Sequence, residues 1–359
     1  MTFPEIDSFA VELQPVSAEH EEPAPAPGNE RARSYLRAVR SIVVFGVLLG
    51  VYRLVGDDLP GWLSVAVGIS AAMAIGRFIV HLGRARFGPK WNATLWMSVA
   101  WLVLLTGAAA LADVLPLKEP ASADFSKKDF RPALSIHEPF GYDGFGRSNL
   151  SRVIYGARVS LGIGLGAAAL GLLVGGLLGL IAGYARGWTD SIISLFADSL
   201  LAFPPLILLI GLVAVLPKTP TTIAFGIGTL IVPTFIRLSR ANTLTYAQRE
   251  FVLAAHCLGL KRRRILFREI LPNVALPVMA YTFVVIALVI VAEGSLSYLG
   301  VGIQPPSASW GRMIADGQPR FGPTPHLVFV PSLVMFGTLL ALNRIGEQLR
   351  ASLAPVVRR

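Results

Sequence analysis

Long apolar stretches alternate with shorter polar segments along most of the chain. Crossing a hydrocarbon core of about 30 Å takes a helix of roughly 20 mostly apolar residues. Eight stretches meet this requirement, at residues 37–56, 60–81, 92–115, 157–184, 192–216, 220–238, 275–297 and 326–346. Because lipid offers the backbone no hydrogen-bond partners, we predict eight helices and an all-α polytopic membrane protein.

The distribution of Lys and Arg predicts the orientation of these spans. With the N-terminus inside, the inner segments would carry twenty Lys and Arg residues and the outer segments nine. Inner loops of membrane proteins are enriched in positive charge, so this distribution favours both termini in the cytoplasm.

The first 90 residues divide into two predicted parts. Residues 1–34 are polar and rich in Pro, Ala and Glu, so we predict a disordered cytoplasmic tail without a cleavable signal peptide. Residues 35–90 would form a transmembrane hairpin that turns near Asp57 and Asp58.

Composition narrows the possible function classes. Hydrophobic residues make up 53% of the chain and charged residues 15%, and the mean hydropathy is +0.61, which is typical of an integral membrane protein. In a membrane protein, a net charge of +10 indicates how the chain is oriented in the bilayer and that it contacts acidic lipid headgroups. Nucleic acid is therefore not a predicted partner. The single cysteine, Cys257, excludes an internal disulfide. No phosphate-binding G-x-x-x-x-G-K-[ST] loop occurs, so ATP binding is not expected.

Small and polar residues within the spans suggest packing and gating positions. Small residues let helices approach closely in lipid, so the glycines of the fourth span are candidates for helix packing, or for a helix that slides during transport. They are Gly162, Gly166, Gly175 and Gly179. Asp198 and Glu293 lie near span ends, where they would be proton relays in a carrier or polar contacts at a helix end. Pro204, Pro205, Pro233, Pro277 and Pro331 would each interrupt or kink a helix.

Residues 239–274 are the most informative polar segment. A short helix at about 248–260 would carry Phe251, Ala254, Ala255 and Leu258 on one apolar side at helical spacing, and Gly259 could end it. Such a helix, presented in the cytoplasm between two spans, suits a groove in a soluble partner. It could equally lie on the membrane surface, with the basic residues 261–264 touching anionic lipid.

This segment resembles the EAA loop of ABC importer permeases. The residues that carry the resemblance are Glu250, Ala254, Ala255, Gly259, Leu271 and Pro272. The resemblance implies that they form a coupling helix and its continuation, which sit against an ATPase subunit.

Three further segments resemble the C-type permeases for dipeptides, oligopeptides and nickel, and the similarity extends from about 92 to 355. These segments cover residues 140–158, 198–205 and 293–311. The last one is similar to the outer loop before the final span, which makes gate candidates of Glu293, Gly300, Gln304, Pro305, Pro306 and Trp310. The chain departs from the family pattern at Ser148, His256, Cys257 and Glu269.

The resemblance implies a six-helix type I ABC importer permease core, to which this chain adds the N-terminal hairpin. The first core span and outer loop would cover 91–156, and the permease transmembrane domain 157–359. The expected function is a non-catalytic, multi-pass subunit of the bacterial plasma membrane that forms half of a pathway for di- or oligopeptides. Nickel and glutathione are alternative substrates.

The resemblance also implies the partners. These are a second homologous permease subunit, two ATPase subunits or one fused ATPase, an extracellular substrate-binding protein, and membrane lipid. The chain itself would have no catalytic residue, metal or cofactor, because ATP and Mg would bind to the partner subunits. Two other classes remain open: a secondary transporter driven by an ion gradient without partner subunits, and a membrane scaffold or sensor.

Overall fold

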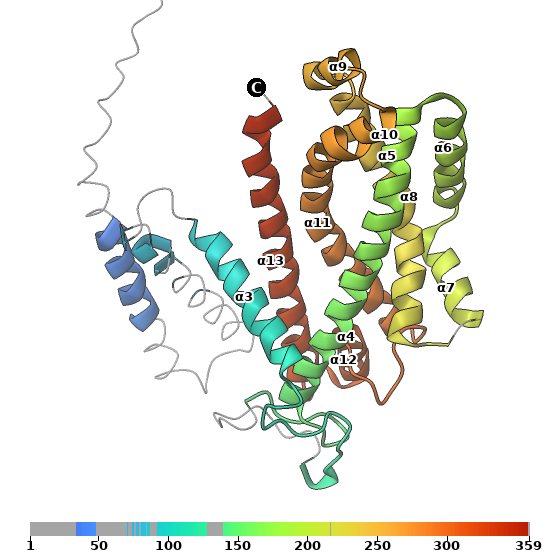
Figure 1. Ribbon diagram of the computed structural model, residues 1–359. Helices are drawn as coiled ribbons and strands as arrows, with labels where there is room; N and C mark the ends of the chain where they lie inside the picture. The colour runs from blue at the N-terminus through green and yellow to red at the C-terminus, as the bar shows by residue number, and fades with distance from the viewer. Residues whose placement is uncertain are drawn as a thin grey trace, which may run out of the picture. The chain divides into compact units, whose positions relative to one another are not determined.

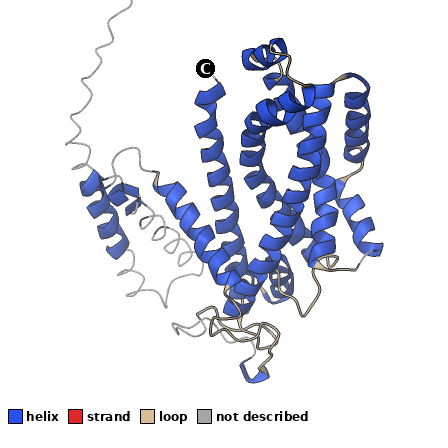
Figure 2. Cartoon of the chain, in the orientation of Figure 1, coloured by secondary structure: helices blue, strands red, loops and turns tan. Residues whose placement is uncertain are grey.

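The computed structural model describes residues 34–47, parts of 70–86, 92–127, 139–215 and 217–357. Within these residues the chain is nearly all helical, and extended backbone pairs only in an isolated bridge between Tyr142 and Ser148 (Figure 2). The expected all-α class is therefore confirmed for the described part of the chain. The chain divides into two compact units, Met1–Ala93 and Thr94–Arg359.

The first unit contains a helix over residues 34–47 and further helical turns within 70–86. The predicted tail at 1–34 lies outside the described residues except for its last position. Much of the predicted hairpin, including the turn near Asp57, also lies outside them. The two hairpin spans therefore remain predictions.

The second unit is built from long helices joined by short ones (Figure 1). Their bounds are α3 (Ala93–Ala110), α4 (Asn149–Leu170), α5 (Gly176–Ala185), α6 (Gly187–Leu201), α7 (Pro205–Val215), α8 (Pro220–Tyr246), α9 (Glu250–Cys257), α10 (Arg262–Arg264), α11 (Leu271–Tyr298), α12 (Trp310–Gly317) and α13 (His326–Val357). A π-helical segment at Gly171–Gly175 connects α4 to α5, and another at Ile265–Ile270 connects α10 to α11.

Five continuous helical runs among the described residues are long and apolar enough to cross a membrane. They are Ala93–Ala110, Asn149–Ala185, Pro220–Tyr246, Arg262–Tyr298 and His326–Ser352. Each overlaps a predicted span, although the second begins at Asn149 rather than at the predicted residue 157. The described residues therefore support a polytopic membrane protein with five such helices, or six if α6 and α7 together form one span.

The stretch predicted as one span at 192–216 contains two helices. The axes of α6 and α7 differ in direction by 82°. The break lies at Pro204 and Pro205, which lack the amide hydrogen needed inside a helix. Pro205 is the first residue of α7, a position at which an amide hydrogen would have no intrahelical acceptor. A proline that could not continue α6 is therefore well placed to start α7.

The core of the second unit lies where α4, α8 and α11 meet, and buried residues of all three belong to one apolar cluster. Phe235 of α8 is fully buried and contacts the ring of Tyr281 of α11 edge-on, at a centroid distance of 6.2 Å. In Figure 1, α9 lies at one end of this unit and α12 at the opposite end. The helices between them therefore connect two distant polar regions.

Glycines allow α5 to approach α8 closely. A methyl group at Gly179 would lie 2.3 Å from the carbonyl oxygen of Ile236, and one at Gly175 would lie 2.5 Å from that of Val232. Contacts this short exclude any side chain. Of the other two predicted packing glycines, Gly166 has a looser approach of 3.5 Å, and Gly162 has no neighbour within 4 Å.

Candidate functional site

The first candidate region is the short helix α9, Glu250–Cys257, which lies within the range 248–260 predicted for a helix. Its C-terminus is closed by two backbone hydrogen bonds, from Gly259 N to the His256 oxygen (2.9 Å) and from Leu260 N to the Ala255 oxygen (3.2 Å). This pattern is a Schellman motif, and it requires a left-handed residue after the helix. Gly259 supplies it with a φ of 71°, so the chain reverses direction sharply behind α9.

Only one side of α9 is buried. Val252 and Ala255 are buried, and they belong to the same apolar cluster as Ile265 and Ile270 of the π-helical segment. α9 is therefore attached to the segment that leads directly into α11.

The remaining surface of α9 exposes apolar side chains. Phe251 is 40% exposed and Leu258 is 80% exposed, and Ala254 is exposed between them. Residues spaced by three and four positions share one side of a helix, so these three form a continuous apolar strip. Glu250 is exposed in the first turn of α9, where a negatively charged side chain interacts favourably with the positive end of the helix dipole.

Leu271 and Pro272 lie at the start of α11, immediately after the π-helical segment. Pro272 has no amide hydrogen to donate to the carbonyl of Arg268, so the regular helical pattern cannot continue through this point. The side-chain nitrogen of Asn273 donates to the neighbouring carbonyl of Glu269 at 2.7 Å. The junction between the α9 region and α11 is thus locally irregular but continuous.

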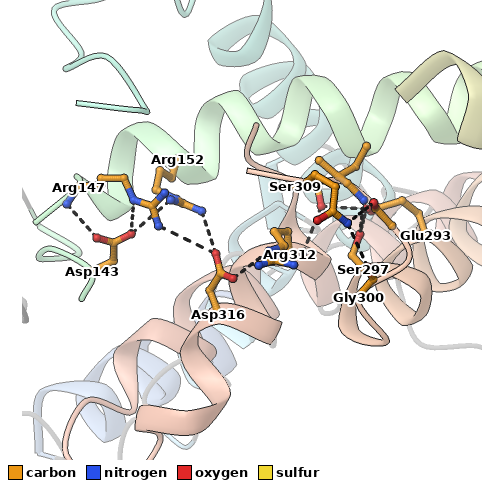
Figure 3. Close-up of polar contacts among 12 residues, drawn as sticks. Asp143, Arg147, Arg152, Glu293, Ser297, Gly300, Ser309, Arg312 and Asp316 are labelled. Carbon is orange, nitrogen blue, oxygen red and sulfur yellow. Dashed lines mark hydrogen bonds and ion pairs between the residues drawn. The ribbon is translucent and has the colours of Figure 1, made fainter. Parts of the chain in front are cut away.

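The second candidate region lies at the opposite end of α11 and centres on Glu293, which is fully buried (Figure 3). Three serine hydroxyls donate to its carboxylate. Ser297 and Ser309 donate to Oε1 at 2.7 and 2.8 Å, and Ser160 of α4 donates to Oε2 at 3.2 Å. The carboxylate therefore joins α11, α4 and the residue that precedes α12.

Each of these serine oxygens also accepts one backbone N–H. Ser297 accepts from Ile303, at 3.2 Å. Ser160 accepts from Trp310, and Ser309 caps α12 by accepting from Arg312, both at 3.2 Å. A buried carboxylate needs several donors to offset its lost hydration, and here those donors simultaneously fix the backbone between α11 and α12.

The other predicted gate residues surround this carboxylate. Trp310 is fully buried, and its Nε1 donates to the carbonyl of Val153 at 3.1 Å. Gly300 has a φ of 79°, and its carbonyl accepts from the Gln304 side chain at 3.0 Å. Pro305 and Pro306 are exposed at the tip of the loop.

Sequence reasoning did not identify the three serines. Ser297 follows Glu293 by four residues and so shares its helical face, which is a signal that could have been used. Ser160 is 133 residues away from Glu293, and nothing local in the sequence indicates their contact.

A network of charges lies beside this region at the N-terminal end of α4 and in α12 (Figure 3). Arg152 is 3% exposed and bridges two carboxylates, with Nη1 at 3.3 Å from Asp143 and Nη2 at 3.4 Å from Asp316. Arg147 pairs with Asp143 at 2.7 Å, and Arg312 pairs with Asp316 at 2.8 Å. These five residues border a cavity of about 370 Å³.

Asp113 follows α3 and is held by two residues of α4. The Tyr155 hydroxyl donates to its Oδ1 at 3.0 Å, and the Arg158 guanidinium lies 3.0 Å from its Oδ2. Both contacts, the Tyr155 hydrogen bond foremost, hold the pKa of Asp113 below its usual value. The stabilisation is therefore present at neutral pH and is lost as the pH falls through the lowered pKa. Because Asp113 is largely exposed, we expect the effect to be small.

Comparisons with known proteins relate the chain to transport. Residues 175–359 match the family described as "Binding-protein-dependent transport system inner membrane component". The chain is 34% identical over 260 residues to the dipeptide transport system permease protein DppC of Alkalihalophilus pseudofirmus, covering 72% of this chain and 86% of the relative. It is 37% identical over 215 residues to the glutathione transport system permease protein GsiD of Pectobacterium atrosepticum, covering 60% of this chain and 71% of the relative.

Proposed function

Because the chain belongs to the family of binding-protein-dependent transport system inner membrane components, we propose that it forms half of the translocation pathway of an importer for short peptides. It is a non-catalytic permease subunit of a bacterial ABC transporter, located in the inner membrane. A subunit of this kind works together with ATPase and binding-protein partners.

The exposed apolar strip of α9 is the observation that carries the coupling role. Phe251, Ala254 and Leu258 project from a helix whose other side is fixed by Val252 and Ala255. Exposed apolar side chains on a short, rigidly attached helix suit a cleft in a partner protein. In this proposal the partner is the ATPase subunit, and α9 is the coupling helix.

The attachment of α9 offers a path for transmitting motion. Because α9 packs on the segment that continues into α11, a displacement of α9 would move α11 as a rigid rod. α11 has 28 residues, which corresponds to about 42 Å at 1.5 Å per residue. Its far end carries Glu293, whose hydrogen bonds fix the outer loop. Closure of the ATPase subunits would thus reach the outer end of the permease and switch it between inward- and outward-facing states.

Short peptides are the substrate class that the relatives support. The names of the two relatives above specify a dipeptide and glutathione, and glutathione is itself a short peptide. We assign the same class to this chain, with nickel as the alternative. A second homologous permease subunit would complete the pathway, and an extracellular binding protein would deliver the peptide to the outer loops.

Co-purification tests the coupling assignment. Phe251→Arg places a charge in the apolar strip of α9, and we expect the affinity for the ATPase to fall at least about a hundredfold, since a buried unpaired charge costs about 3–5 kcal/mol. Phe125→Arg is the matched control, because Phe125 is equally aromatic, 71% exposed and outside the α9 region. Equal ATPase recovery with both variants would contradict the assignment.

Uptake by the reconstituted complex tests the substrate class. A labelled dipeptide and glutathione should enter proteoliposomes only with ATP and the binding protein, and nickel should not. Uptake by the purified chain alone, driven by an ion gradient, would overturn the proposal.

A further inference from the structure

A cavity in the first unit carries an excess of positive charge. Its volume is about 550 Å³, which lies within the roughly 300–1,000 Å³ that is usual for small-molecule sites. It is lined by Arg37, Arg40, Ser41, Val44, Ser70, Ala74, Arg77 and His81. None of these described lining residues is acidic, so the described part of the lining carries a net positive charge.

The lining residues come from two helical faces. Arg37, Arg40 and Val44 are separated by three and four positions on the helix at 34–47, so they share one face. Arg77 and His81 are four positions apart in the second helical segment and also share a face. The cavity therefore forms where these two faces meet, and the cationic side chains border it from both sides.

Three guanidinium groups that border one cavity repel each other unless an anion lies between them. The ion pairs formed within the described residues do not include Arg37, Arg40 or Arg77. A guanidinium group is always charged and presents a planar fork of donors that matches the oxygens of a phosphate group.

We propose that this cavity binds the phosphate group of an anionic phospholipid. The helix at 34–47 exposes apolar side chains on the side of Arg40, including Leu36 at 70% and Val47 at 60%. A ligand that combines a phosphate with acyl chains would satisfy both the cavity and this apolar surface. The bound headgroup would anchor the N-terminal unit at the membrane interface, and this role is independent of the transport function proposed above.

Lipid retention by the complete transporter tests the proposal. The complex containing the full chain would be purified in detergent, exposed to phosphatidylglycerol or phosphatidylcholine, and examined by native mass spectrometry. Phosphatidylglycerol should be retained about tenfold more than phosphatidylcholine. One Arg near an anionic surface contributes about 1 kcal/mol, so each of Arg37→Gln, Arg40→Gln and Arg77→Gln should weaken retention about fivefold. The triple variant should weaken it about a hundredfold.

Arg86→Gln is the matched control, because Arg86 is exposed in the same unit and does not line the cavity. Equal retention of phosphatidylglycerol by the triple variant and by Arg86→Gln, with both variants eluting as intact complexes, would overturn the proposal. A third arm adds millimolar inorganic phosphate. Loss of the bound lipid in this arm would show that the cavity binds phosphate groups. It would overturn the phospholipid as the ligand and identify a free anion instead. Persistence of the lipid would support the phospholipid.

Discussion

The Oγ of Ser309 lies 2.8 Å from Oε1 of Glu293, and this contact joins the first turn of α12 to the interior of α11. The same hydroxyl accepts a hydrogen bond from the backbone N–H of Arg312 at 3.2 Å, so it acts as both donor and acceptor. The two other serines that reach this carboxylate repeat the arrangement. One buried side chain therefore holds the backbone between α11 and α12 through three hydroxyl groups.

Removal of this carboxylate should destabilise the protein. In Glu293→Ala three serine hydroxyls lose their acceptor in a buried site, and we expect a loss of about 3 kcal/mol in unfolding free energy. Glu293→Gln keeps one acceptor oxygen and should lose less. Thermal unfolding of the detergent-purified protein measures both, with Ser295→Ala as the control, because Ser295 is exposed and bonds only to the Val291 carbonyl of its own helix. Equal stability of the Ala variant and the control would refute this role.

Gly179 and Gly162 provide a matched pair for the packing of α5 on α8. A methyl group at Gly179 meets the Ile236 carbonyl at 2.3 Å, whereas one at Gly162 meets nothing within 4 Å. Gly179→Ala should therefore destabilise by about 1–3 kcal/mol through overpacking. Gly162→Ala should be neutral or stabilise by up to about 1 kcal/mol, because alanine is the better helix former. Identical unfolding temperatures of the two variants would show that α5 and α8 are not in close contact.

Gly259 should be required for coupling. Proline fixes φ near −65°, which is incompatible with the observed 71°, and it removes the N–H that bonds to the His256 carbonyl. In Gly259→Pro we expect ATP-driven uptake to fall at least about tenfold, while the chain still inserts into the membrane. Gly259→Asn is the control, since asparagine tolerates the left-handed region, and it should keep most of the uptake. Normal uptake by the proline variant would contradict the prediction.

Arg152 should contribute more to stability than either of its two acidic partners. Arg152→Met removes a cation shared by Asp143 and Asp316, although these keep their pairs with Arg147 and Arg312, so we expect a loss of about 2–3 kcal/mol. Because Asp143→Asn removes part of the same contact, the double variant should lose less than the sum of the two singles. Unfolding measurements on the two singles and the double give the coupling energy. Additive effects would mean that the buried pair is not energetically coupled.

The sequence alone determined those features that depend on local chain properties. Apolar length is sufficient to predict the helices at 93–110 and 326–352, because a chain in lipid must satisfy its backbone internally. The position of Gly259 is likewise local, since a helix followed by glycine tends to end in a left-handed cap. The interruption predicted at Pro204 and Pro205 is confirmed as a bend of 82°, whereas α8, α11 and α13 continue through Pro233, Pro277 and Pro331, where the sequence predicts one as well.

The tertiary structure decided which distant residues meet. Ser160 and Glu293 are 133 residues apart, and Trp310 bonds to Val153 across 157 residues. Such contacts depend on how α4, α11 and α12 pack, and no periodicity within any one helix specifies them. The same is true of α9, where Ala255 is buried and Phe251 is exposed although both belong to the predicted apolar side. Helix formation is a local balance of burial and hydrogen bonding, whereas the choice of partner is a property of the whole packed chain.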